Sequence, residues 1–188
     1  MARDTGDWFS GVVILNNLEI LTGELKISGK YDAVQVIVYG AIRTIPAREI
    51  VKVSFHDPSV NCVRTLITTS SGKSKGHIGF YEVLIHGEVS LLASYQHYNR
   101  FDGASKLLSD NTVEIPEDMQ LYFYDGKTVI ASRNFRKQVY PAFMNVFGDD
   151  LTDYIKSHRV RLEDALGQIM LLQRFNLLYA KSKLLAID

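Results

Sequence analysis

Very short connections between strand-like segments are the feature that most restricts the fold of this chain. Three hairpins are expected, formed by residues 12–15 with 18–27, 80–85 with 89–94, and 121–124 with 128–132. Their turns are Asn16-Asn17, His86-Gly87-Glu88 and Asp125-Gly126, and Asn and Gly tolerate the positive φ that tight turns require. Parallel neighbours need a crossover of roughly a dozen residues or more. The connections therefore predict an antiparallel meander and exclude a doubly wound α/β fold.

Alternating apolar residues indicate that each strand buries one face. The valines at 34, 36 and 38 recur with a period of two, and so do the apolar residues at 51, 53 and 55. In the segment 18–27 the apolar phase changes between Ile20 and Leu21, and Gly23 follows. This pattern indicates a bulge or a sharp bend of the kind that curls a sheet. We expect a bent antiparallel sheet, or a small barrel or roll.

Beyond Phe135 the apolar period changes to that of helices. Pro141 suits the first turn of a helix that runs to Phe147, and Gly148 can end it. A second short helix and a longer one over about 161–180 are expected to follow. The predicted class is therefore α+β and mainly β, with a β-rich region at 1–135 and two to three helices in 136–188 that pack on the sheet as part of one domain.

Composition narrows the functional classes. The 188 residues include 21 basic and 21 acidic side chains without blocks of like charge, so nucleic acid is not an expected partner. The apolar runs are too short to span a bilayer, so we expect a soluble globular protein with no transmembrane segment. The start of the chain lacks the pattern of a signal peptide. We therefore expect a cytoplasmic location, or a periplasmic or exported one if a signal has been removed. Cys62 is the single cysteine and forms no disulfide within the chain.

The sequence contains no motif that predicts catalysis, metal binding or a cofactor. The segment 72–76 matches the G-x-S-x-G pattern of hydrolases, but a strand-like segment follows Ser74 where a helix is needed. The five histidines, at 56, 77, 86, 97 and 158, lack the spacing of zinc ligands. No catalytic residue, metal ligand or cofactor is therefore predicted.

An aromatic and basic cluster follows the strand-like segment 89–94. Tyr95, His97, Tyr98 and Arg100 run from the end of this strand into an irregular stretch. Tyrosine and arginine combine apolar area with hydrogen-bonding groups and are enriched at binding surfaces. These four residues are the predicted ligand- or partner-binding site.

Two resemblances add to these observations. The segments Gly11-Val12-Val13-Ile14-Leu15 and Leu21-Thr22-Gly23-Glu24-Leu25 are similar to the opening of small barrels of the Sm-like and SH3-like kind, over about residues 8–57. Sm-like proteins bind RNA bases through an Asp and an Asn, but Ala33-Val34-Gln35-Val36 follows Asp32 here, without a matching Asn. The resemblance therefore does not extend to RNA binding.

Taken whole, the chain resembles a group of uncharacterised β-rich bacterial proteins. The resemblance rests on the segments 42–47, 80–83 and 175–178, and it implies no reaction. We expect a non-enzymatic binding or structural module that engages a protein partner or a component of the bacterial cell envelope, with homodimerisation through the last helix as an option.

Two alternatives stay open. One is a hydrolase with dispersed residues, including His97 and acids in 97–117, and the other is a nucleic-acid-binding barrel using Lys26, Lys30, Arg43 and Arg48.

Overall fold

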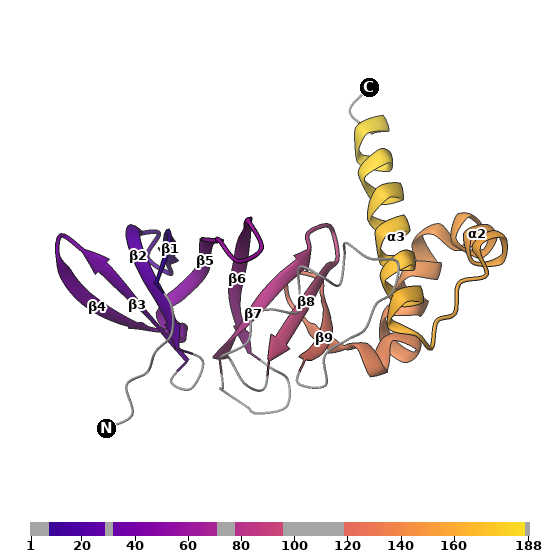
Figure 1. Ribbon diagram of the computed structural model, residues 1–188. Helices are drawn as coiled ribbons and strands as arrows, with labels where there is room; N and C mark the ends of the chain where they lie inside the picture. The colour runs from indigo at the N-terminus through magenta and orange to yellow at the C-terminus, as the bar shows by residue number, and fades with distance from the viewer. Residues whose placement is uncertain (1–7, 29–31, 71–77, 96–118, 187–188) are drawn as a thin grey trace.

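The computed structural model describes residues 8–28, 32–70, 78–95 and 119–186, which form an α+β fold that is mainly β. One open sheet of ten antiparallel strands comes first along the chain, and two α-helices follow it. The strands are β1 (Phe9–Leu15), β2 (Ile20–Ser28), β3 (Ala33–Val38), β4 (Ala41–Pro46), β5 (Ile50–Asp57), β6 (Cys62–Ser70), β7 (Ile78–Ile85), β8 (Ser90–Tyr95), β9 (Met119–Tyr124) and β10 (Val129–Ala131). Figure 1 shows an elongated molecule with β3 and β4 at one end and the helices at the other. The predicted class, with an antiparallel sheet and C-terminal helices, is confirmed.

The order of the strands differs from a simple meander in the first half of the sheet. From β5 to β10 each strand pairs with the next along the chain, but β5 pairs with β1 and not with β4. A 3-10 turn, η2 (Ala47–Glu49), lies between β4 and β5. The meander prediction is therefore confirmed within β1–β4 and within β5–β10 and is wrong at one step, from β4 to β5. The pairing of β5 with β1 sets Val13 opposite Val53, and both side chains are fully buried.

The three predicted hairpins are present, but the first turn differs from its prediction. Asn16 and Asn17 were expected to form a two-residue turn, whereas the connection spans residues 16–19 and the positive φ, 67°, belongs to Leu18. The asparagine side chains are used for hydrogen bonds instead. Asn16 Nδ2 donates to the Arg48 carbonyl at 2.6 Å, and Asn17 Oδ1 accepts from the Glu19 N–H at 3.0 Å.

Gly23 does not form the predicted bulge, since the register of β1 with β2 runs through it without a shift. A Cβ atom at this position would lie 2.2 Å from the carbonyl oxygen of Ile37, so glycine permits a close approach of β3 to β2. The register shifts lie elsewhere, at Ile14/Leu15 between β1 and β5 and at Val83/Ile85 between β7 and β8.

Two large hydrophobic cores stabilise the molecule. The first core is shared by β1–β7 and includes Val13, Leu25, Ile45, Phe55, Leu66 and Phe80. The second core joins β8 and β9 to the helices and includes Leu91, Phe123, Phe135, Phe143, Leu172 and Phe175. A smaller cluster contains Tyr81, Leu92 and Tyr122. It lies on the opposite face of the sheet from the second core, because consecutive residues such as Leu91 and Leu92 point to opposite faces.

The C-terminal helices pack on this second core. A π-helical turn, η4 (Phe135–Val139), leads into α2 (Tyr140–His158), and Phe147 interrupts α2 with non-helical angles (φ −135°, ψ 43°). The two helices predicted there are thus one helix with a kink next to Gly148. The predicted last helix is α3 (Ala165–Leu185), which Asn176 joins to the sheet by two hydrogen bonds with the Val89 backbone. Within the described ranges, no helix is long and apolar enough to span a bilayer.

Candidate functional site

The aromatic site predicted at the end of β8 falls mostly outside the described residues. Tyr95 is the last residue of β8, and its backbone pairs with Met119 of β9. His97, Tyr98 and Arg100 lie outside the described residues, and so does the serine motif at 72–76. Binding of a ligand or partner at these positions stays a prediction.

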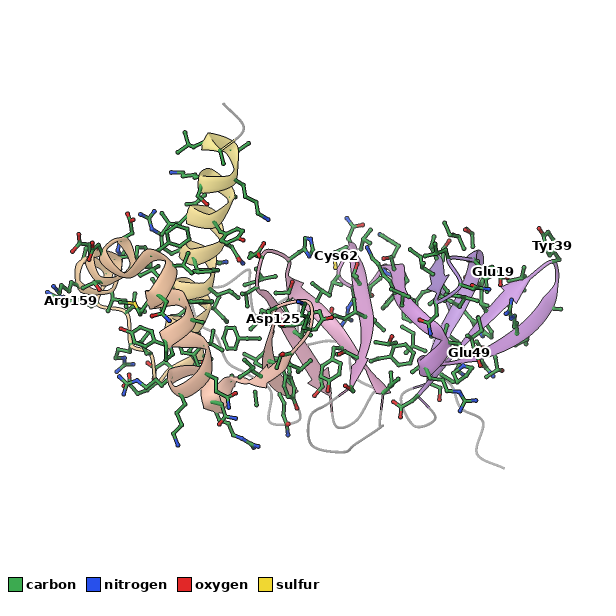
Figure 2. The ribbon with its side chains drawn as sticks, turned by 180° about the vertical axis from the view of Figure 1, so that it is seen from behind. Glu19, Tyr39, Glu49, Cys62, Asp125 and Arg159 are labelled. Atoms are coloured by element: carbon green, nitrogen blue, oxygen red, sulfur yellow. The ribbon has the colours of Figure 1, made fainter. Side chains whose placement is uncertain are left out.

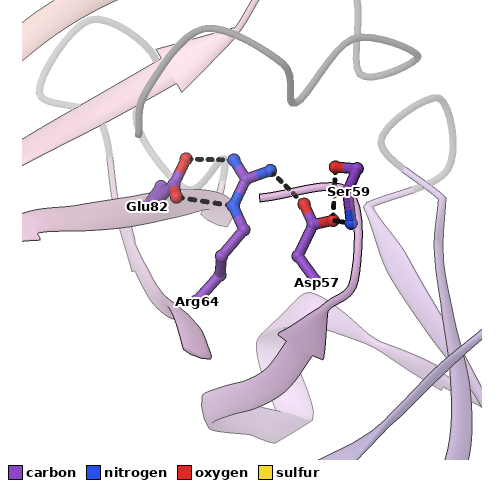
Figure 3. A network of polar contacts seen from close by, with 4 residues as sticks. All are labelled: Asp57, Ser59, Arg64 and Glu82. Atoms are coloured by element: carbon purple, nitrogen blue, oxygen red, sulfur yellow. Dashed lines mark hydrogen bonds and ion pairs between the residues drawn. The ribbon is translucent and has the colours of Figure 1, made fainter. Parts of the chain in front are cut away.

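A buried polar cluster joins β5, β6 and β7 (Figure 3). Arg64 of β6 is 3% exposed, Asp57 at the end of β5 is 4% exposed, and Glu82 of β7 is 5% exposed. Each charged residue lies on the buried face of its strand, two positions from a buried apolar residue. Asp57 follows Phe55 in this way. Arg64 and Glu82 stand in the same relation to Leu66 and Phe80, respectively. The sequence analysis missed this cluster. A charge on the apolar face of a strand was the signal that could have revealed it.

Both acidic side chains of the cluster are held by the Arg64 guanidinium. Arg64 Nε and Nη2 donate to the two oxygens of Glu82 at 2.7 and 2.6 Å, and Nη1 donates to Asp57 Oδ2 at 3.0 Å. The other oxygen of Asp57 accepts from the N–H and the hydroxyl of Ser59 at 3.0 and 2.6 Å. A two-pronged contact between Arg and a carboxylate is strong and geometrically specific. The cluster therefore fixes the β5–β6 turn against β7.

The protonation of Asp57 agrees with this structural role. Burial, the largest single influence, raises the pKa of Asp57, but hydrogen bonds from Ser59 and Arg64 together outweigh it and the pKa is lowered from 3.8. A carboxylate held in the ionised form is poorly suited to exchange protons near neutral pH. Since the guanidinium already binds two carboxylates, an anionic ligand would have to displace one of them. The cluster is therefore a structural element and not a candidate active site.

Other polar groups considered for chemistry are engaged in local contacts. His56 Nε2 lies 3.3 Å from Asn61 Oδ1, and the His158 ring stacks on Tyr154. Within the ranges that the structure describes, no three His, Cys, Asp or Glu side chains gather in a way that could hold a metal ion.

Exposed apolar side chains gather at the opposite end of the molecule from the helices. We call this the hairpin surface, and it consists of Leu18 (79% exposed), Ile20 (64%), Tyr39 (104%) and Ile42 (61%) with the ion pair of Glu19 and Arg43. Arg43 Nη1 donates to Glu19 Oε1 at 2.9 Å, which joins the β1–β2 turn to β4. This hydrogen bond, followed by one from Asn17, lowers the pKa of Glu19. Figure 2 shows Tyr39 at the tip of the β3–β4 hairpin, with Glu19 at the same end of the molecule.

The backbone of β4 adds hydrogen-bonding groups to the hairpin surface. Tyr39 and Gly40 have positive φ values of 51° and 79°, which is the pattern of a two-residue type I′ turn. In such a turn the backbones of the closing pair, here Val38 and Ala41, are hydrogen-bonded to each other. Along an antiparallel pair of strands, hydrogen-bonded residue pairs alternate with pairs whose backbone groups point away from the partner strand. The backbone groups of Ile42 and Thr44 therefore point away from β3. Because β4 is the last strand of the sheet, these groups face its open edge.

The basic residues considered for nucleic-acid binding occupy different environments. Lys26 is 7% exposed, Arg43 pairs with Glu19, and Arg48 is exposed on η2. Lys30 lies outside the described residues.

No protein-family model, no curated protein and no solved structure matches the chain. A functional assignment therefore depends on the geometry of the hairpin surface and the open edge of β4.

Proposed function

We propose that the protein is a non-enzymatic binding module that holds an extended segment of a partner protein along the open edge of β4. The exposed edge backbone beside Tyr39 and Ile42 is the observation that carries this proposal. An extended peptide can join a sheet edge as an additional strand, with main-chain hydrogen bonds for affinity and side-chain contacts for specificity. Ile42 and Thr44 would supply the hydrogen bonds, and Tyr39 and Ile42 the apolar contact.

The two edges of the sheet differ in a way that favours β4. The other edge strand, β10, has only three residues and leads directly into a 3-10 turn and η4. Short or covered edges are protected against pairing. In contrast, β4 has six residues, of which 41–44 are all exposed. Only Pro46 limits this edge, because proline lacks the N–H that a further strand would need.

We also propose that residues 8–57 form a small module of the Sm-like or SH3-like kind. In support, the strand order β5-β1-β2-β3-β4 runs through this segment, and η2 precedes β5. Ile45 of β4 belongs to the same core as Phe80 of β7, so side chains from distant strands of the sheet meet in one core.

A peptide library displayed on phage and selected on the immobilised protein tests the binding function. Thr44→Pro removes an edge N–H but leaves the pairing with β3 intact, and Ile42→Lys places a charge in the apolar contact. We expect selected peptides to bind the wild type and to lose at least about tenfold in affinity with either variant. Val63→Lys is the matched control, because Val63 is 70% exposed on β6, outside the hairpin surface.

Nuclear magnetic resonance would locate the peptide independently. We expect the amide signals of Ile42 and Thr44 to shift on titration with a selected peptide. Peptides that bind Thr44→Pro and Ile42→Lys as tightly as the wild type would contradict the proposal, as would shifts confined to other strands.

A further inference from the structure

Arg43 lies between the two residues of β4 whose backbone groups face the open edge. An antiparallel segment would exchange hydrogen bonds with the backbones of Ile42 and Thr44, so its residue opposite Arg43 would belong to the intervening non-hydrogen-bonded pair. In such a pair the two Cα atoms are only about 4.5 Å apart, compared with about 5.5 Å in a hydrogen-bonded pair. The side chains are therefore closest at this position, and the charge of Arg43 acts most strongly on the partner residue there.

The side chain of Arg43 lies on the face of the sheet opposite to those of Ile42 and Thr44. Side chains alternate between the two faces along a strand, and Arg43 pairs with the fully buried Val36 of β3 whereas Ile42 pairs with the half-buried Ile37. A partner residue opposite Ile42 would extend this row of two isoleucines and should be apolar. The residue opposite Arg43 would instead meet a guanidinium on the other face.

The Arg43 guanidinium has donors left for a second carboxylate. Among the described residues it donates one hydrogen bond, from Nη1 to Glu19 Oε1, and its side chain is 47% exposed. A guanidinium carries five N–H donors. Arg64 of the same chain holds two carboxylates, those of Asp57 and Glu82. The ion pair with Glu19 therefore does not prevent Arg43 from binding an acidic residue of a partner.

The position of Glu19 leaves the edge side of Arg43 open. Glu19 directly precedes β2, and β3 lies between β2 and β4 in the sheet. Glu19 therefore reaches Arg43 from the side of the sheet, and an added strand would approach from the opposite side.

We propose that the segment bound at the β4 edge pairs antiparallel to β4 and carries an acidic residue opposite Arg43, followed by an apolar residue opposite Ile42. This inference rests on the proposed function, because it specifies the chemistry of the segment that the edge holds. Opposite charges directly across two strands stabilise the pairing, and like charges destabilise it. A basic residue opposite Arg43 is therefore disfavoured. Antiparallel pairing continues the arrangement of the sheet and is slightly more stable per residue than parallel pairing.

A phage-displayed library of nine-residue peptides tests the preference. Its central three residues are Thr-X-Ile, with X any residue and the flanking positions random, and we expect selection on the immobilised protein to enrich Asp and Glu at X. Synthetic forms of one enriched peptide, with Glu, Gln or Lys at X, are then compared by calorimetry. The Glu peptide should bind about three- to tenfold more tightly than the Lys peptide, with the Gln peptide between them. The difference should shrink at about 1 M sodium chloride, because salt screens an exposed contact.

A charge exchange attributes the preference to Arg43. Glu19→Arg combined with Arg43→Glu retains an ion pair between the β1–β2 turn and β4 but reverses the charge beside the edge. We expect this double variant to bind the Lys peptide more tightly than the Glu peptide. The matched control is Arg136→Glu with Glu163→Arg, which exchanges the charges of an exposed ion pair in the C-terminal helical region. This control should leave the preference for the Glu peptide unchanged.

Peptides with a nitroxide label test the antiparallel direction. A label at the N-terminus of the Glu peptide should broaden the amide signal of Ala47, and a label at its C-terminus should broaden that of Gly40. The reverse pattern would overturn the antiparallel pairing.

The outcomes separate this inference from the proposed function. Peptides that Thr44→Pro weakens, but that bind equally well with Glu, Gln or Lys at X, would overturn the acidic preference alone. A preference for Glu that the exchange of Glu19 and Arg43 does not reverse would also overturn it. A library that yields no binder, or binders that Thr44→Pro leaves unchanged, would overturn both the inference and the proposed function.

Discussion

Replacement of Arg64 by methionine should strongly destabilise the fold. Methionine retains much of the apolar stem of arginine but removes the three hydrogen bonds to Asp57 and Glu82. The side chains of Arg64, Asp57 and Glu82 are only 2%, 6% and 6% exposed, so water cannot replace the lost guanidinium. Removal of one partner from a buried ion pair costs about 3–5 kcal/mol. For a chain of this size each kcal/mol lowers the melting temperature by roughly 2–4 °C, which gives a decrease of about 6–20 °C.

Thermal and urea unfolding followed by circular dichroism would measure this change. Arg43→Met is the control, because Arg43 forms the same kind of ion pair with Glu19 but its side chain is 47% exposed. Exposed ion pairs contribute little, so the control should leave the midpoint nearly unchanged. A loss of less than about 1 kcal/mol for Arg64→Met, or equal losses for both variants, would refute the reasoning that burial makes the cluster structurally important.

Three further predictions concern other contacts. The pKa of Asp57 is lowered in the folded protein. The ionised side chain therefore stabilises the fold at pH values above the ordinary pKa of 3.8, and this stabilisation is lost as the pH falls through the folded pKa. Asp57→Asn should therefore reduce the loss of stability that the protein shows at acidic pH. Asn176→Ala removes both hydrogen bonds to the β7–β8 connection and should cost about 1–3 kcal/mol, with faster amide hydrogen exchange in that connection. Gly167→Ala should destabilise the protein, because the added Cβ atom would collide with the carbonyl oxygen of Arg161. Gly148→Ala should instead raise the melting temperature, because its Cβ atom would contact only the Met144 methyl group, at 4.0 Å.

The strands were predictable because their signals are local. Period-two alternation and turn residues located the β7–β8 and β9–β10 hairpins, and the antiparallel direction followed from the short connections. The kink in α2 was also visible, since Gly148 adjoins the irregular Phe147. These features depend on neighbours within a few residues, which is the range over which turn geometry and helix propensity act.

The return of β5 to β1 was not predictable in the same way. It depends on contacts between residues about forty positions apart, such as Val13 with Val53, and no local pattern specifies which earlier strand a new strand will join. The Arg64 cluster was missed for a related reason. Asp57, Arg64 and Glu82 are far enough apart in the sequence that only the pairing of β5, β6 and β7 brings them together.

The position of the Arg64 cluster bears on the proposed binding edge. It bridges β5, β6 and β7 at the centre of the sheet, with the hairpin surface on one side of these strands and the helices on the other. Because β5 pairs with β1, a cluster that fixes β5, β6 and β7 supports the strands that lead to the β4 edge.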